Sequence, residues 1–115
     1  MSNSLAFVFP GQGSQAIGMS SALAAKYPLV QDLYEQANDA LGIDLWAMTQ
    51  NGPLEELSQT QNTQPALLTA GVAAYRCWLE AGGKAPSLMA GHSLGEYTAL
   101  CCAGALNFVD AVALV

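Results

Sequence analysis

Charged side chains are scarce in this sequence. They make up only 10% of its 115 residues, whereas an average soluble domain has roughly 25%. Hydrophobic residues account for 52%. A small independent domain has a large surface for its volume, so it needs more polar surface than this chain offers. We therefore expect 1–115 to be the N-terminal portion of a larger domain, interrupted within a helical pattern at 108–115.

Basic residues are the scarcest of all. Three Lys and Arg stand against nine Asp and Glu, which leaves a formal net charge of −6. Without a basic cluster, neither nucleic acid nor an anionic membrane surface is an expected partner. The most apolar long stretch, Ala66–Leu79, contains Arg76 and is too short for a membrane span. We expect a soluble, cytoplasmic protein.

Cysteine and histidine are also few. The three cysteines are Cys77, Cys101 and Cys102, and there is one histidine. An odd number of cysteines without C-x-x-C spacing suggests neither a disulfide framework nor a zinc site. We expect buried free thiols and no metal.

Strand and helix patterns alternate along the chain. Short unbroken apolar runs at 5–9 and 87–90 are typical of strands buried on both faces of a parallel sheet. Helical patterns lie between and after them, near 20–26, over 28–41, 44–50 and 65–80, and from 96 onward. This order predicts an α/β fold of three layers with a parallel sheet.

The chemistry-bearing pattern is Gly91-x-Ser93-x-Gly95, between a predicted strand and a predicted helix. This is the nucleophile-elbow pattern, in which the serine hydroxyl projects from a sharp turn. Side chains at 91 and 95 would collide across that turn, which explains the two glycines. The backbone N–H of Leu94, at the start of the helix, could donate to an oxyanion. The alternative is an ordinary serine in a strand-to-helix turn.

The neighbouring His92 invites a Ser–His pairing. Adjacent side chains on a tight turn diverge, however, and a general base must reach the hydroxyl. We therefore assign His92 a packing role beside the site, and expect the base elsewhere.

A second polar loop, Gly11–Gln15, follows the first strand. It lacks the ending of a P-loop and does not fit G-x-G-x-x-G, so nucleotide binding is a weak interpretation. Opposite an elbow, such a loop can supply the second oxyanion N–H.

Three segments together carry a resemblance to a known family: Phe9–Gln15, Thr63–Ala66 and Gly91–Glu96. In order and spacing they resemble the acyltransferases that load malonyl groups onto acyl carrier protein. The resemblance implies an α/β-hydrolase-like core, with a ferredoxin-like subdomain after the segment present here. It also implies malonyl-CoA and acyl carrier protein as substrates, in fatty acid biosynthesis, and no cofactor.

The same resemblance assigns roles to individual positions. Ser93 is the nucleophile, and the backbone N–H groups of Gln12 and Leu94 form the oxyanion hole. A catalytic His and an Arg that pairs with the malonyl carboxylate are expected beyond Val115. Three alternatives remain: an acyltransferase domain of a polyketide synthase, a serine esterase or thioesterase, and a catalytically inactive interaction module.

Overall fold

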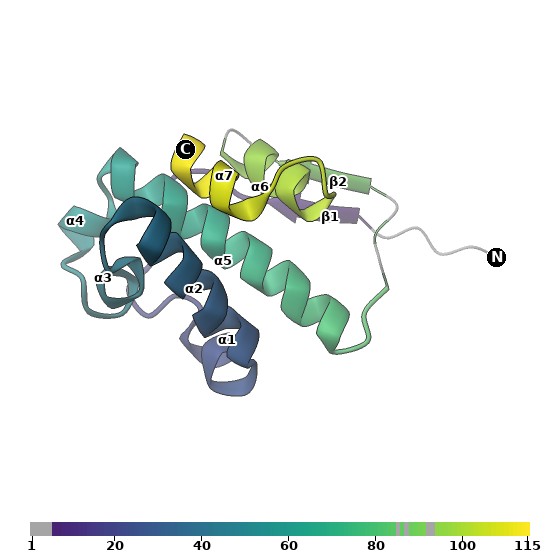
Figure 1. The fold of residues 1–115 in the computed structure, drawn as a ribbon, viewed down its shortest axis with the longest axis horizontal. Helices are drawn as coiled ribbons and strands as arrows, with labels where there is room; N and C mark the ends of the chain where they lie inside the picture. The colour runs from purple at the N-terminus through teal and green to yellow at the C-terminus, as the bar shows by residue number, and fades with distance from the viewer. Residues whose placement is uncertain (1–5, 85, 87, 92–93) are drawn as a thin grey trace.

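The computed structural model describes residues 6–84, 86, 88–91 and 94–115. Helices dominate these parts of the chain, and two short strands, one near the N-terminus and one between α5 and α6, lie side by side (Figure 1). In chain order the elements are β1 Ala6–Phe9, α1 Ser21–Lys26, α2 Pro28–Leu41, α3 Leu45–Asn51, α4 Leu54–Leu57, α5 Thr60–Glu80, β2 Leu88–Gly91, α6 Gly95–Cys102 and α7 Phe108–Leu114.

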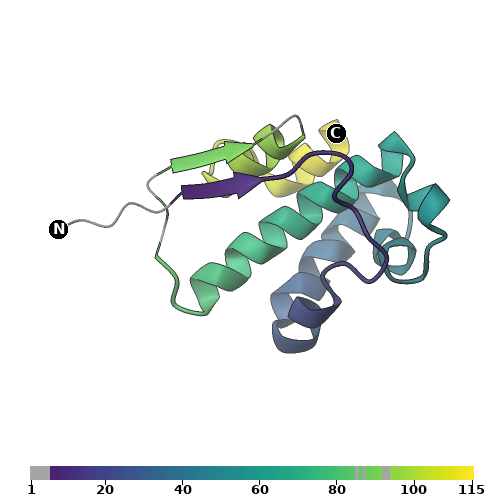
Figure 2. The same ribbon diagram turned by 180° about the vertical axis from the view of Figure 1, so that it is seen from behind.

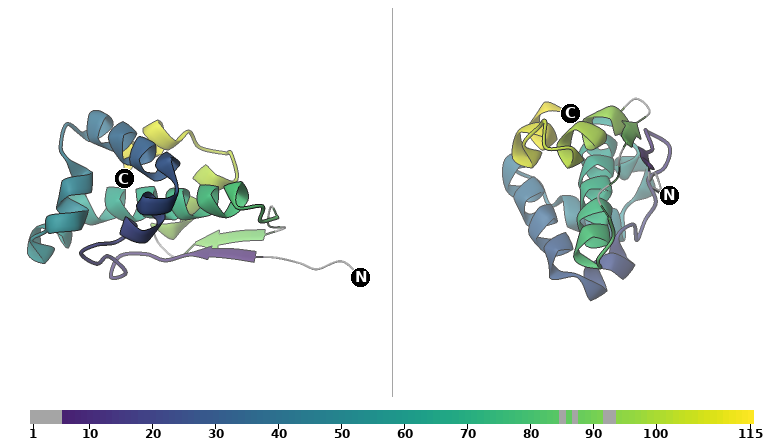
Figure 3. Two further views of the ribbon diagram at one scale, coloured as in Figure 1. Left: turned by 90° about the horizontal axis from the view of Figure 1, so that it is seen from below. Right: turned by 90° about the vertical axis from the view of Figure 1, so that its right-hand side faces the viewer.

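The two strands form a parallel pair, with Ala6 opposite Leu88 and Phe9 opposite Gly91. Helices α5 and α6 cover one face of this pair, and both panels of Figure 3 show the helices on that side of the strands. The prediction of an α/β fold with parallel strands is confirmed.

The expectation that the first strand is buried on both faces is wrong for the described structure. Phe9 is 4% exposed, but its neighbour Val8 is 73% exposed. Successive side chains on a strand point to opposite faces. Phe7 and Phe9 therefore pack against α5 and α6, whereas Ala6 and Val8 lie on a face that no described element covers.

Local signals set most helix ends. Helix α2 begins at Pro28 and ends at Gly42, whose φ of 70° lies in the left-handed region that favours glycine. The Asp44 side chain accepts a hydrogen bond from the Ala47 N–H at 3.0 Å and caps α3. Asn107 caps α7 in the same way, through the Val109 N–H at 3.0 Å. These caps satisfy N–H groups that have no partner within the helix.

Helix α5 starts earlier than its apolar pattern predicts, at Thr60 rather than at Pro65. Contacts with α4 extend it. The Asn62 side chain donates to the Glu56 carbonyl at 2.9 Å, and the buried Thr63 hydroxyl donates to the Leu57 carbonyl. These bonds hold the turn before Pro65, which itself has no N–H to contribute.

The main core lies among α2, α3, α5 and α7. Its largest fully buried side chains include Tyr34, Leu33, Leu45 and Leu68. The Tyr34 hydroxyl shares a hydrogen bond of 3.1 Å with the Ser20 hydroxyl. Among the helices that the structure describes, none has the length and apolar character needed to cross a bilayer.

Candidate active site

The carboxyl ends of the two strands define the candidate site. Because Phe9 and Gly91 are opposite each other in a parallel pair, the segments that follow them leave from the same edge of the sheet. Figure 2 shows the chain turning away from this edge after β1. Pro10, where the chain leaves β1, thereby lies beside Gly95, at the start of α6. Ser93 and His92, the predicted nucleophile and its neighbour, lie outside the described residues.

Gly91 occupies a position where a side chain has no room. A Cβ added there would lie 1.9 Å from the carbonyl carbon of Gly95 and 2.3 Å from the backbone nitrogen of Glu96. The collision expected across the turn is therefore present at Gly91. The backbone at the end of β2 passes directly against the first turn of α6.

Gly95 is required for a different reason. A Cβ at this position would lie 2.1 Å from the carbonyl oxygen of Phe9 and 3.1 Å from that of Pro10. The start of α6 thus packs on the end of β1, across the sheet edge. The spacing of the glycines within the motif did not reveal this contact between β1 and α6.

Leu94 is the residue immediately before α6. Its backbone is already helical, with φ −55° and ψ −33°, and its carbonyl accepts from the Tyr97 N–H at 2.9 Å. Its side chain is 3% exposed. Its N–H has no acceptor among the residues that the structure describes, as expected at the first turn of a helix.

The Gly11–Gln15 loop is held by side chains from a distant part of the sequence. Gln12 donates through Nε2 to the Thr60 hydroxyl at 3.3 Å, and Gln15 donates through Nε2 to the Ser58 hydroxyl at 3.3 Å. Within the loop, the Gly13 N–H donates to Oε1 of Gln15 at 2.8 Å. Sequence reasoning missed Ser58 and Thr60, because no local rule pairs residues so far apart. The one available signal was the nearby Thr63–Ala66 segment.

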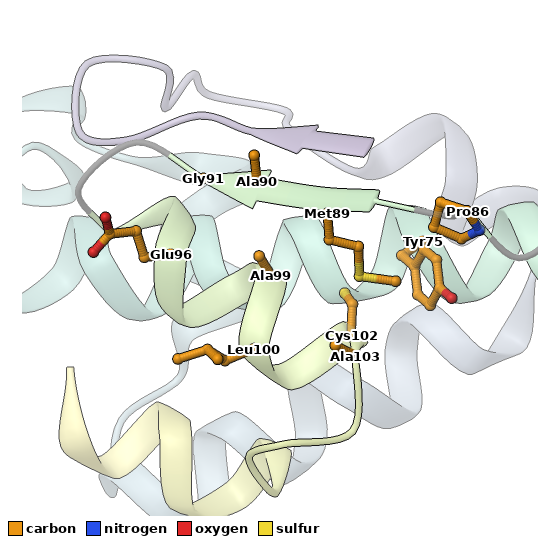
Figure 4. Close-up of a pocket in the computed structure, with 10 residues that line it drawn as sticks. All are labelled: Tyr75, Pro86, Met89, Ala90, Gly91, Glu96, Ala99, Leu100, Cys102 and Ala103. Atoms are coloured by element: carbon orange, nitrogen blue, oxygen red, sulfur yellow. The ribbon is translucent and has the colours of Figure 1, made fainter. Parts of the chain in front are cut away.

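An open apolar pocket of about 860 Å³ adjoins Gly91 on the side of β2 away from β1 (Figure 4). Glu96 is its only charged lining residue within the described part of the chain, so this lining offers no cation to a ligand carboxylate. The pocket is lined by Tyr75, Pro86, Met89, Ala90, Gly91, Glu96, Ala99, Leu100, Cys102 and Ala103.

The cysteines near this pocket are unsuited to nucleophilic attack. All three are free thiols; Cys77 and Cys101 are buried as predicted, whereas Cys102 is half-buried. The pKa of Cys102 is raised to about 12, chiefly by burial and secondly by the neighbouring Cys101, while Arg76 acts in the opposite direction. Burial also raises the pKa of the Cys101 and Cys77 thiols. Thiols with raised pKa values stay protonated at neutral pH, and the thiolate is the reactive form.

Comparison with known proteins identifies relatives along nearly the whole chain. Residues 6–115 match the model of the acyl transferase domain family. The malonyl CoA-acyl carrier protein transacylase of Escherichia coli K12 is 64% identical over 110 residues, which cover 96% of this chain and 36% of that protein. The chain thus spans about a third of the length of such relatives.

Solved structures agree with these sequence matches. The malonyl CoA-acyl carrier protein transacylase of Coxiella burnetii superimposes with a TM-score of 0.95 at 61% identity, over 97% of this chain and 35% of that one. A malonyl-transacylase solved in complex with its type II PKS acyl-carrier protein gives a TM-score of 0.94 at 59% identity, over 97% and 36%.

Proposed function

Because the chain belongs to the acyl transferase domain family, we propose that it is the N-terminal portion of an enzyme that moves malonyl groups from malonyl-CoA to acyl carrier protein. The observation that carries this proposal is the 64% identity to a malonyl CoA-acyl carrier protein transacylase over 96% of the chain. The positions of the Gln12 and Leu94 loops at one sheet edge support it.

The proposed reaction is an acyl exchange in two steps through Ser93. The Ser93 oxygen attacks the thioester carbonyl of malonyl-CoA, its proton passes to a base, and the carbon–sulfur bond breaks to release CoA as the thiol. The phosphopantetheine thiol of the carrier protein then attacks the malonyl-serine ester. A new thioester forms, and Ser93 regains its proton.

The backbone N–H groups of Gln12 and Leu94 would stabilise the oxyanion that develops in each step. Two donors from separate loops are the usual construction of such a site, and both act without titrating. The base and the cation that would pair with the malonyl carboxylate are proposed to lie in the part of the enzyme after Val115. The absence of a basic side chain from the described pocket lining supports this assignment.

The finer description of the fold belongs to the same proposal. We assign residues 1–115 to a three-layer α/β-hydrolase-like core that continues in the complete enzyme and precedes a ferredoxin-like subdomain. The sheet face bearing Val8, which is 73% exposed, supports a further layer that covers it there.

Mass spectrometry of the complete enzyme tests the proposal. Incubation with malonyl-CoA should leave a malonyl adduct on Ser93. The Ser93→Ala variant should show none, whereas Ser21→Ala, which removes an exposed hydroxyl at the start of α1, should be labelled normally. An adduct on another residue, or none in the wild type, would contradict the assignment.

The choice of acceptor separates the remaining alternatives. The adduct should transfer to fatty-acid carrier protein faster than it hydrolyses. Preferential transfer to a polyketide carrier protein would place the enzyme in polyketide synthesis. Loss of the adduct to water, without transfer to either carrier, would identify an esterase.

A further inference from the structure

We propose that Gln15 is a positioning residue for the oxyanion loop, which it holds in place through Ser58. This inference deepens the function proposed above and rests on it. It assigns a role in the reaction to a side chain that need not touch substrate.

The Gln15 carboxamide makes two contacts, one inside the loop and one outside it. Its Oε1 accepts from the Gly13 N–H at 2.8 Å, inside the loop. Its Nε2 donates to the Ser58 hydroxyl at 3.3 Å, outside the loop. A planar carboxamide fixes the direction between its acceptor and its donor. Gln15 therefore links the backbone of the loop to Ser58 through one rigid group.

The first contact occupies one N–H group of the loop, next to that of Gln12. The Gly13 N–H is occupied by Gln15 and cannot serve a ligand. The preceding N–H, that of Gln12, has no acceptor in the described part of the chain. Gln12 N–H is the group to which the proposed mechanism assigns the oxyanion, and the Gly13–Gln15 bond lies one peptide away from it.

Ser58 is a well-held anchor. It follows α4, and its N–H donates to the Leu54 carbonyl at 2.8 Å. The turn around it is joined to α5 by the Asn62 side chain, which donates to the Glu56 carbonyl at 2.9 Å, and by the buried Thr63 hydroxyl, which donates to the Leu57 carbonyl. The hydrogen bond to Ser58 therefore fixes the loop relative to α5, the long helix of the core.

The chain that follows the loop is held by α3. The Gly18 N–H donates to the Thr49 carbonyl at 2.7 Å, and Nε2 of Gln50 donates to the Met19 carbonyl at 2.9 Å. These bonds hold residues 18 and 19 beside α3. Figure 2 shows the chain after β1 running along this side of the helices toward α1. Near the sheet edge, Gln15 and the Gln12 side chain are the described side chains that tie the loop to 58–60.

Steady-state and burst kinetics of the complete enzyme test the role of Gln15. The variants are Gln15→Ala, Ser58→Ala, the double variant, and Ser58→Thr, which keeps the hydroxyl. Gln36→Ala, an exposed position on α2, is the matched carboxamide truncation. We would measure KM for malonyl-CoA, the thermal midpoint, and kcat divided by the number of Ser93 residues that can be acylated.

In a variant whose loop is intact but displaced, kcat should fall and KM should stay unchanged. We expect Gln15→Ala to lower kcat about tenfold, less than the roughly 10²–10³ lost when an oxyanion donor is deleted, because the Gln12 N–H is still there. Ser58→Ala should lower kcat at least about threefold, since small displacements of a catalytic group are costly. The double variant should be no worse than Gln15→Ala, and Ser58→Thr and Gln36→Ala should match the wild type.

A merely structural role would lower the thermal midpoint and leave kcat per acylatable Ser93 unchanged. That result for Gln15→Ala would overturn the inference, as would a double variant whose loss is the product of the two single losses. If Gln15→Ala does not fold, the contrast between Ser58→Ala and Ser58→Thr decides, and equal kcat values would overturn it. A wild type that transfers no malonyl group would refute the proposed function, and this inference with it.

Discussion

Replacing Gly91 by alanine would place a methyl group inside the backbone of the next helix. The added Cβ would lie 1.9 Å from the carbonyl carbon of Gly95, 2.0 Å from its oxygen and 2.3 Å from the nitrogen of Glu96. Ordinary carbon contacts are about 3.5–4.0 Å. All three obstructing atoms belong to the backbone, so no side-chain rotation can relieve the overlap. Either β2 or the start of α6 must move by more than about 1 Å.

The expected cost has two parts. Overpacking a tight site costs typically about 1–3 kcal/mol, and a collision with backbone belongs at the upper end, so we expect Gly91→Ala to lose about 3 kcal/mol of stability. A displacement of about 1 Å at a catalytic group can also cost about 10²-fold in rate. Leu94 and the proposed nucleophile Ser93 lie between Gly91 and Gly95 in the sequence, so we expect acyl loading to fall by that factor in the molecules that remain folded.

Gly42→Ala is the matched control. Gly42 has a φ of 70° and nothing within 4 Å of an added Cβ. Its substitution should therefore cost only the roughly 1–2 kcal/mol of a left-handed alanine. Urea unfolding of the complete enzyme gives the two stabilities, and single-turnover mass spectrometry gives the rate at which Ser93 is malonylated. If Gly91→Ala proves as stable as Gly42→Ala and loads malonyl within tenfold of the wild type, the steric argument fails.

Two further predictions concern α6 and α7. Leu94→Ala keeps the proposed oxyanion donor but removes most of a side chain that is 3% exposed. We expect a stability loss of about 2–5 kcal/mol, with activity per folded molecule largely retained. Leu94→Pro removes the donor, and its turnover should fall by roughly 10²–10³. Equal turnover in these two variants, with folding checked by circular dichroism, would show that the Leu94 N–H does not hold the oxyanion. Asn107→Ala removes the cap that accepts from Val109 N–H and Asp110 N–H and should lower the free energy of unfolding by about 1 kcal/mol; an unchanged urea midpoint would contradict this.

The alternation of strands and helices could be predicted from the sequence because its causes are local. Pro28, Gly42, Asp44 and Asn107 each act on the backbone within a few residues, and the structure places helix ends at all four. Where the cause is a contact with a distant element, prediction failed. The early start of α5 depends on α4, through the hydrogen bond from Asn62 to the Glu56 carbonyl.

Burial of the strands is also a tertiary property. A short apolar run such as Ala6–Phe9 is compatible with burial on one face or on two, since apolar residues at every position satisfy both. Which face is covered depends on where α5 and α6 pack. In the described structure they cover the face of Phe9 and leave Val8 exposed.

The sequence alone showed which residues to consider for the candidate site. They are the spaced Gly91, Ser93 and Gly95 and the polar Gly11–Gln15 loop, because the residues that a tight turn needs lie close together in the chain. Only the tertiary structure decided how these segments are held. The end of β1 explains why position 95 has no room for a side chain, since a Cβ there would meet the Phe9 carbonyl. Ser58 accepts the bond from Gln15. Both contacts join residues that are distant in sequence, and only the packing of the strands and α5 brings them within reach.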